Sequence, residues 1–199
     1  MLPEPKDTRA RRPSWKVVAV LCIIGGATAI WMLLPYLMYS GPQPRQPSRR
    51  AYCLSNEKQI LLAMAMYADQ SQGRLPMDSS NPTLVGSMKL LSNIVTTAKI
   101  FHCPSDTRPG ARAETNFQKL TTLNISYSYV PNLKWQDTPD SPLIVDRIYS
   151  TAKGDAWPSD GNHGTNGGNV GFNDGHVSWN STLPAALKDK TGKEVVLSP

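Results

Sequence analysis

Histidine and oxygen-bearing side chains gather in a polar, glycine-rich stretch near the C-terminus: Asp155, Asp160, Asn162, His163, Asp174 and His176. Two histidines with a carboxylate can bind zinc, and a loop rich in oxygen ligands can bind calcium. The spacing fits neither site well, because no H-E-x-x-H or complete twelve-residue calcium loop is present. Asp174 before Gly175 is also typical of a hairpin turn. We therefore expect a structural polar loop, with calcium at Asp155, Asp160, Asn162 and Asp174 as the first alternative and a transition metal as the second.

Two of the three cysteines, Cys53 and Cys103, are candidates for a structural disulfide if this part of the chain lies outside the cytoplasm. The alternative is a pair of unpaired, buried thiols. Cys22 lies in a long apolar run and has no evident partner.

Enzymatic chemistry has little support in the sequence. There is no G-x-S-x-G elbow, no P-loop and no G-x-G-x-x-G fingerprint. Cys103 and His163 could be proposed as a catalytic nucleophile and its general base, but a disulfide at Cys103 would remove the thiolate that such chemistry needs. We expect no enzyme activity, no catalytic residues and no cofactor, calcium apart.

The elements that must position these residues can be predicted from periodicity. Residues 50–72 place apolar side chains on one wide face, as in a helix packed on a sheet, and Gly73 ends it. A second, short helix is expected around residues 83–94. Strands are expected at 125–130, 143–146, 169–172 and 176–179, the last two joined by the hairpin signal Asn173-Asp174-Gly175.

Residues 17–39 form a 23-residue run without a charge. As a helix this run would span about 34 Å, which matches a hydrocarbon core of about 30 Å. A cleaved signal peptide is the alternative, but its apolar core would be shorter and would end in small residues. We expect an uncleaved transmembrane helix.

The flanking charges weakly indicate how the transmembrane helix is oriented in the membrane, since five basic residues precede the span and four follow it closely. We expect a cytoplasmic basic tail at 1–16. Residues 40–48 contain Pro42, Pro44 and Pro47 and are expected to form a stiff, extended linker.

The net charge of +6 does not indicate a nucleic-acid-binding protein. The first fifty residues hold eight basic and two acidic residues, so the other 149 carry 13 of each sign. A basic face on the folded part is therefore excluded as the source of the charge, and nucleic acid is not an expected partner.

Several ordered motifs between residues 49 and 180 resemble those of the bacterial pseudopilin-like proteins that carry a C-terminal motif of His, nine residues, then Asp-Gly. The motifs are Arg49-Arg50-Ala51-Tyr52-Cys53-Leu54-Ser55-Asn56-Glu57-Lys58-Gln59-Ile60, Met64 to Asp69, Gly73 to Pro76, Cys103 to Asp106, Ser126 to Pro131, Pro142 to Asp146, His163-Gly164, and Gly168 to Val177 with Asp174-Gly175-His176. The resemblance implies an α+β fold in which an N-terminal transmembrane helix leads into an amphipathic helix packed on a small antiparallel β-sheet.

The chain departs from this family at two points. The family's apolar helix is headed by a Gly followed by Phe-Thr-Leu-x-Glu, where this chain has Trp15-Lys16-Val17-Val18. In addition, ten residues rather than nine separate His163 from Asp174.

The resemblance implies a non-enzymatic structural or interaction subunit of a type II secretion or pilus-like assembly. Its partners would be the membrane, through residues 17–39, and other pseudopilin or secretion-system subunits. We expect a pseudopilin-like domain at 49–182 on the periplasmic side of the bacterial inner membrane, followed by a C-terminal tail at 183–199. The alternative function is a stand-alone, membrane-tethered module that binds a ligand or an ion and does not polymerise.

Overall fold

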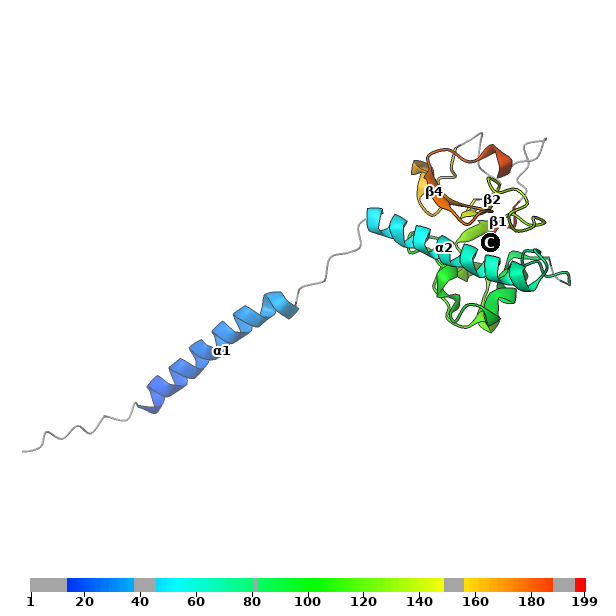
Figure 1. Ribbon diagram of the computed structural model, residues 1–199. Helices are drawn as coiled ribbons and strands as arrows, with labels where there is room; N and C mark the ends of the chain where they lie inside the picture. Colours follow the sequence, from blue (N-terminus) through cyan, green and yellow to red (C-terminus); the bar gives the residue numbers. More distant parts are fainter. Residues whose placement is uncertain (1–13, 38–45, 81, 149–155, 188–195) are drawn as a thin grey trace, which may run out of the picture. The chain divides into compact units, whose positions relative to one another are not determined.

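The computed structural model describes residues 14–37, 46–80, 82–148, 156–187 and 196–199. The chain divides into two compact units, residues 1–43 and 44–199. The first holds the apolar helix α1 (Trp15–Leu37), and the second holds an α+β domain (Figure 1).

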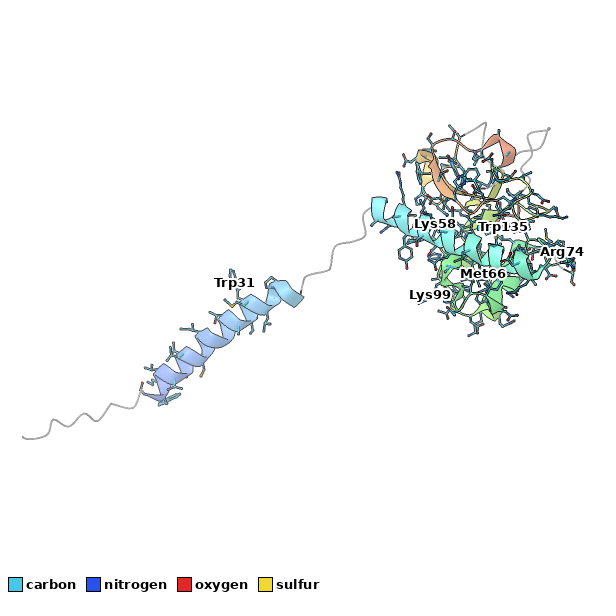
Figure 2. The ribbon with its side chains drawn as sticks, in the orientation of Figure 1. Trp31, Lys58, Met66, Arg74, Lys99 and Trp135 are labelled. Carbon is cyan, nitrogen blue, oxygen red and sulfur yellow. A yellow bond between two sulfur atoms is a disulfide. The ribbon has the colours of Figure 1, made fainter. Side chains whose placement is uncertain are left out.

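Helix α1 is long and apolar enough over Trp15–Pro35 to cross a membrane, and it is the one such helix in the described part of the chain. Its large side chains are exposed all round, with Trp31 81% accessible (Figure 2). A helix that is apolar on every side has no polar face to turn toward water. The helix begins two residues before the expected span, and residues 38 and 39 of that span lie outside the described residues.

Helix α2 (Gln46–Gln70) begins four residues earlier than the periodicity predicts. Residues 46–48 had been assigned to the extended linker, and that assignment is wrong for these three residues. Pro47 lies in the first turn, where proline is tolerated because the backbone N–H has no helical partner there. The helix ends near Gly73, whose N–H donates to the carbonyl of Ala68 with a positive φ of 77°.

The expected second helix forms as α3 (Leu84–Lys89), followed by a 3-10 turn, η1 (Leu90–Asn93). Thr83 is its N-cap, accepting a hydrogen bond from the N–H of Gly86. The loops of the described part of the chain also contain short 3-10 helices. These are η2 (Ala98–Phe101), η3 (Phe117–Lys119), η4 (Thr122–Asn124), η5 (Gly164–Asn166) and, after the last strand, η6 (Ala185–Leu187).

All four expected strands are present and form one antiparallel sheet in the order β1-β2-β3-β4. Their bounds are β1 (Tyr127–Tyr129), β2 (Pro142–Asp146), β3 (Gly168–Phe172) and β4 (Val177–Asn180). The turn between β3 and β4 contains Gly175 with a φ of 91°, as the hairpin signal predicts.

Helix α2 packs on the sheet mainly over β3, and on its other side it contacts η2 (Figure 1). The approach to β3 is close, because a Cβ added at Gly171 would lie 2.8 Å from both Leu61 Cδ1 and Ile144 Cγ2. The α+β arrangement expected from the sequence is therefore present.

Described residues of the C-terminal tail, expected at 183–199 without a clear pattern, contribute to this domain. Leu183 and Leu187 are buried beside Val145 and Val170. Leu197 forms an isolated bridge with Tyr129, with backbone hydrogen bonds of 2.7 and 2.9 Å. Leu183 and Leu187 therefore pack on the face of the sheet that carries Val145 and Val170, and Leu197 lies along the edge of β1.

Candidate functional site

The disulfide expected between Cys53 and Cys103 is present. Its Sγ atoms are 1.98 Å apart, and both residues are completely buried. The bond joins the second turn of α2 to the loop after η2. Next to it, the side-chain amide of Asn56 donates to the carbonyl of His102 at 2.9 Å, which adds a second link between the two segments.

His163 lies against this disulfide, with Nε2 4.0 Å from Cys103 Sγ. Its ring meets Trp179 of β4 edge-on, with ring centroids 5.3 Å apart, and the Arg50 guanidinium stacks over the same tryptophan at 4.2 Å. Burial, together with the positive charge of Arg50, lowers the pKa of His163 to about 4. The imidazole is therefore neutral at pH 7.

Asp146, at the end of β2, also lies near this imidazole nitrogen. Its Oδ2 is 3.4 Å from His163 Nε2 and accepts a hydrogen bond of 2.6 Å from the backbone N–H of Asn169. Its Oδ1 accepts a 2.8 Å bond from Asn162. Burial outweighs these hydrogen bonds and raises the pKa of Asp146 to about 6.

Glu57 adds a second buried carboxyl, one helical turn after Cys53. It is completely buried, and neither of its carboxylate oxygens has a hydrogen-bond partner in the described part of the chain. Burial, and then the nearby charge of Asp146, raise the pKa of Glu57 well above its usual value. Such a group is costly to bury in its charged form, so it is held as the neutral acid.

We call Cys53, Glu57, Cys103, Asp146, Asn162 and His163 the buried polar cluster. Within the described residues, the side chains placed closely enough to share a metal ion are Cys53, Cys103 and His163, whose ligand atoms lie within 4.8 Å of one another. A Cys–His pair therefore exists in space, but its sulfur is bonded to Cys53 and is not a free nucleophile.

A second buried group surrounds Asp106, three residues after Cys103. Its carboxylate forms an ion pair of 2.7 Å with Arg108, accepts a 2.8 Å hydrogen bond from the Ser126 hydroxyl, and lies 3.7 Å from Arg147. Burial acts to raise the pKa of Asp106, but the hydrogen bonds from Arg108 and Ser126 outweigh it, and the pKa is lowered. We interpret the Asp106 group as structural, because the partners of its carboxylate, Arg108, Ser126 and Arg147, all lie within the domain.

The described candidate calcium ligands, Asp160, Asn162 and Asp174, differ in their surroundings. Asn162 is buried and donates its side-chain amide to the Ser126 carbonyl and to Asp146. Asp160 is 55% exposed and lies 3.9 Å from Arg147, which also donates to its carbonyl. Asp155 lies outside the described residues. Calcium binding at these residues stays a prediction.

Asp174 and His176 lie in the β3–β4 turn, beyond the opposite end of β3 from His163. Asp174 Oδ1 accepts from the backbone N–H of His176 at 3.0 Å and lies 2.5 Å from its Nδ1. The His176 ring stacks on Phe172, with centroids 4.2 Å apart. The His163 and Asp174-Gly175-His176 parts of the sequence motif therefore occupy two sites, one buried and one exposed.

Sequence reasoning missed two acidic members of the cluster, Asp146 and Glu57. One signal was available: Glu57 lies four residues after Cys53 on the apolar face of α2, where a carboxyl is unexpected. Asp146 carried no such signal, because only the sheet brings it to His163.

One side of α2 also leaves apolar side chains without cover: Tyr52 and Leu62 are each 63% exposed and Met66 is 45% exposed (Figure 2). We call these three residues the outer stripe of α2. Beside Tyr52 is a largely apolar groove of about 380 Å³, lined also by Arg49, Lys99 and His102.

No family model, no curated protein and no solved structure matches this chain.

Proposed function

We propose that this protein is a membrane-anchored, pseudopilin-like subunit with no enzymatic activity, which acts through contacts with other subunits of a type II secretion or pilus-like assembly. The observation that carries the proposal is the order of elements: a helix apolar on every side, then α2 on an antiparallel sheet. The sequence resemblance implies the same order.

The outer stripe of α2 supports an interaction role. Residues 52, 62 and 66 lie within about 80° of one another around a helix, so they share one side of α2, with the exposed Ser55 and Gln59 between Tyr52 and Leu62. Exposed apolar strips on a helix are typical of surfaces that contact another protein. We assign the contact with neighbouring subunits to this side of α2.

The disulfide supports the proposed topology. Structural disulfides persist in oxidising compartments such as the bacterial periplasm and are rare in the cytosol. With α1 as an uncleaved anchor in the inner membrane, residues 1–14 are cytoplasmic and the domain from residue 46 onward is periplasmic.

Site-directed photo-crosslinking in membranes tests the proposal. A photoreactive residue replaces Leu62 in the full-length protein, and a matched variant carries it at Thr182, which is exposed beyond β4. We expect crosslinked species containing this chain or pseudopilin subunits from position 62 only. A membrane-bound protein that stays monomeric from both positions would contradict the assembly role.

The groove beside Tyr52 favours a second candidate, a membrane-tethered binding module that does not polymerise. Arg49 and Lys99 at its rim are suited to a small anionic ligand with an apolar part. A monomer in the crosslinking experiment would favour this function.

A further inference from the structure

We propose that reduction of the Cys53–Cys103 disulfide creates a buried site for one thiolate-preferring divalent metal ion such as zinc, with Cys53, Cys103 and His163 as ligands and the carboxylate of Asp146 beside them. The proposal does not depend on the assembly role. The disulfide and the metal site are alternative states of the same two sulfur atoms, so they exclude each other.

The ligand atoms of Cys53, Cys103 and His163 lie within 4.8 Å of one another, which is close to the spacing in a zinc site. With Zn–S bonds of about 2.3 Å and Zn–N or Zn–O bonds of about 2.0 Å, neighbouring ligand atoms lie roughly 3.3–3.8 Å apart. His163 Nε2 is 4.0 Å from Cys103 Sγ and 3.4 Å from Asp146 Oδ2. Once the S–S bond is broken, the two sulfurs must separate by about 1.8 Å, which side-chain rotation can supply.

The surroundings provide the support that a metal site needs. The ligands of a metal site are usually surrounded by a second layer of hydrogen-bonded groups. Asp146, which lies 3.4 Å from His163 Nε2, is such a group and is held by the Asn169 N–H at 2.6 Å and by Asn162 at 2.8 Å. The completely buried Glu57 carboxyl, without a hydrogen-bond partner among the described residues, lies near enough to Asp146 for their charges to interact.

The charges balance within the buried site. Two thiolates offset the 2+ charge of the ion, so the metal with its two cysteines and a neutral imidazole adds no net charge to the core. The neighbouring Asp146 carboxylate makes the position more favourable for a cation than for an anion.

The conversion takes two steps. A dithiol reductant exchanges with the disulfide, which breaks the S–S bond, transfers two electrons and two protons to Cys53 and Cys103, and leaves the reductant as a disulfide. The metal ion then forms two metal–sulfur bonds and displaces the two thiol protons to solvent.

The test uses the full-length protein in detergent with Cys22→Ser, so that no third thiol takes part. The probes are Zn²⁺ and Co²⁺ alone, added to oxidised protein and to protein reduced with a phosphine. We expect one ion per chain in the reduced form only, with thiolate-to-cobalt absorption and protection of Cys53 and Cys103 from alkylation. No stoichiometric ion in the reduced protein, or equal binding in the oxidised protein, would overturn the proposal.

Two variants locate the site. His163→Gln is expected to weaken metal binding at least about 10-fold, whereas His176→Gln, in the exposed turn, changes it less than about 3-fold. Equal affinity in His163→Gln and its parent would place the ion elsewhere. Near-ultraviolet circular dichroism follows the fold throughout: if reduction unfolds the chain, Zn²⁺ must restore the signal in the parent but not in His163→Gln, and failure to restore it counts against the site.

Discussion

The carboxylate of Asp106 shows how a single buried residue holds three loops together. It forms an ion pair with Arg108, accepts a hydrogen bond from the hydroxyl of Ser126 just before β1, and lies 3.7 Å from Arg147 after β2. Breaking a buried ion pair by removing one partner is costly, because the remaining charge is left uncompensated.

Replacing Asp106 by Asn is expected to lower the free energy of unfolding at pH 7 by about 3–5 kcal/mol. The pKa of Asp106 is lowered in the folded protein, so the folded state binds fewer protons than the unfolded state. Its contribution is therefore present above the unfolded pKa of 3.8 and is lost as the pH falls through the lower folded value.

Denaturant unfolding of both proteins at pH 7 and near pH 2.5 measures this effect. The difference between wild type and Asp106→Asn should shrink at the lower pH, because the carboxyl is protonated below 3.8 in the unfolded chain and at a lower pH in the folded protein. Glu114→Gln serves as a control, since that carboxyl is also hydrogen-bonded but lies at the surface in a partly exposed residue. A difference that grows with acid would show that Asp106 does not stabilise the fold as a carboxylate.

For single residues, the sequence predicts the roles that depend on neighbouring residues, but not the contacts that depend on the fold. The Asp174-Gly175 turn follows from neighbouring residues alone. The pairing of His163 with Asp146, by contrast, depends on the register of β2 and β3, which no local pattern specifies. The motif residues His163 and Asp174 suggested a single loop site, but β3 separates them.

Between elements, α2 packs closely on β3 at Gly171. No side chain larger than hydrogen fits there without moving Leu61 or Ile144, both of which are buried. Gly171→Ala is expected to cost about 1–3 kcal/mol of unfolding free energy, as overpacking usually does.

A double-mutant cycle with Leu61→Ala tests this explanation. Shortening Leu61 makes room for the new methyl group, so the double variant should lose less stability than the sum of the two single variants. Ser181→Ala, at an exposed position after β4, should leave stability within about 0.5 kcal/mol. Strict additivity in the cycle would mean that Leu61 does not limit the space at Gly171.

The elements themselves were largely predictable. The four strands and α3 lie where alternation, prolines and the capping threonine indicate. The start of α2 at Gln46 was not predicted, because Pro47 is compatible with both a linker and a first helical turn. The bridge of Leu197 to Tyr129 was also missed, since a single pair of backbone hydrogen bonds leaves no periodicity in a sequence.

For the whole molecule, the disulfide is expected to contribute about 4 kcal/mol, because it closes a loop between residues 50 apart in sequence. Cys53→Ser with Cys103→Ser should lower the free energy of unfolding by up to this amount. Thiol titration under denaturing conditions should find one free thiol, that of Cys22, before reduction and three afterwards. Three thiols before reduction would contradict the bond.

The anchor makes a separate prediction at this scale. Full-length protein should remain in the membrane fraction after carbonate extraction, because α1 is long enough to cross the bilayer. A chain lacking residues 1–43 should be soluble and should keep the near-ultraviolet circular dichroism of the domain, since the core lies wholly within residues 44–199. Extraction of the intact protein by carbonate would contradict a membrane-spanning α1.

The position of the disulfide also has a mechanical consequence. A pull transmitted from the membrane anchor enters the domain through α2 and reaches Cys53 after eight residues of that helix. From there the covalent path crosses directly to Cys103, so the intervening residues carry no load. When the domain is stretched to full length, the oxidised chain should gain about 170 Å less contour than the reduced chain, at roughly 3.4 Å for each of the bypassed residues. The disulfide would therefore carry the force directly from Cys53 to Cys103, so that most of α2 and all of α3 are not extended.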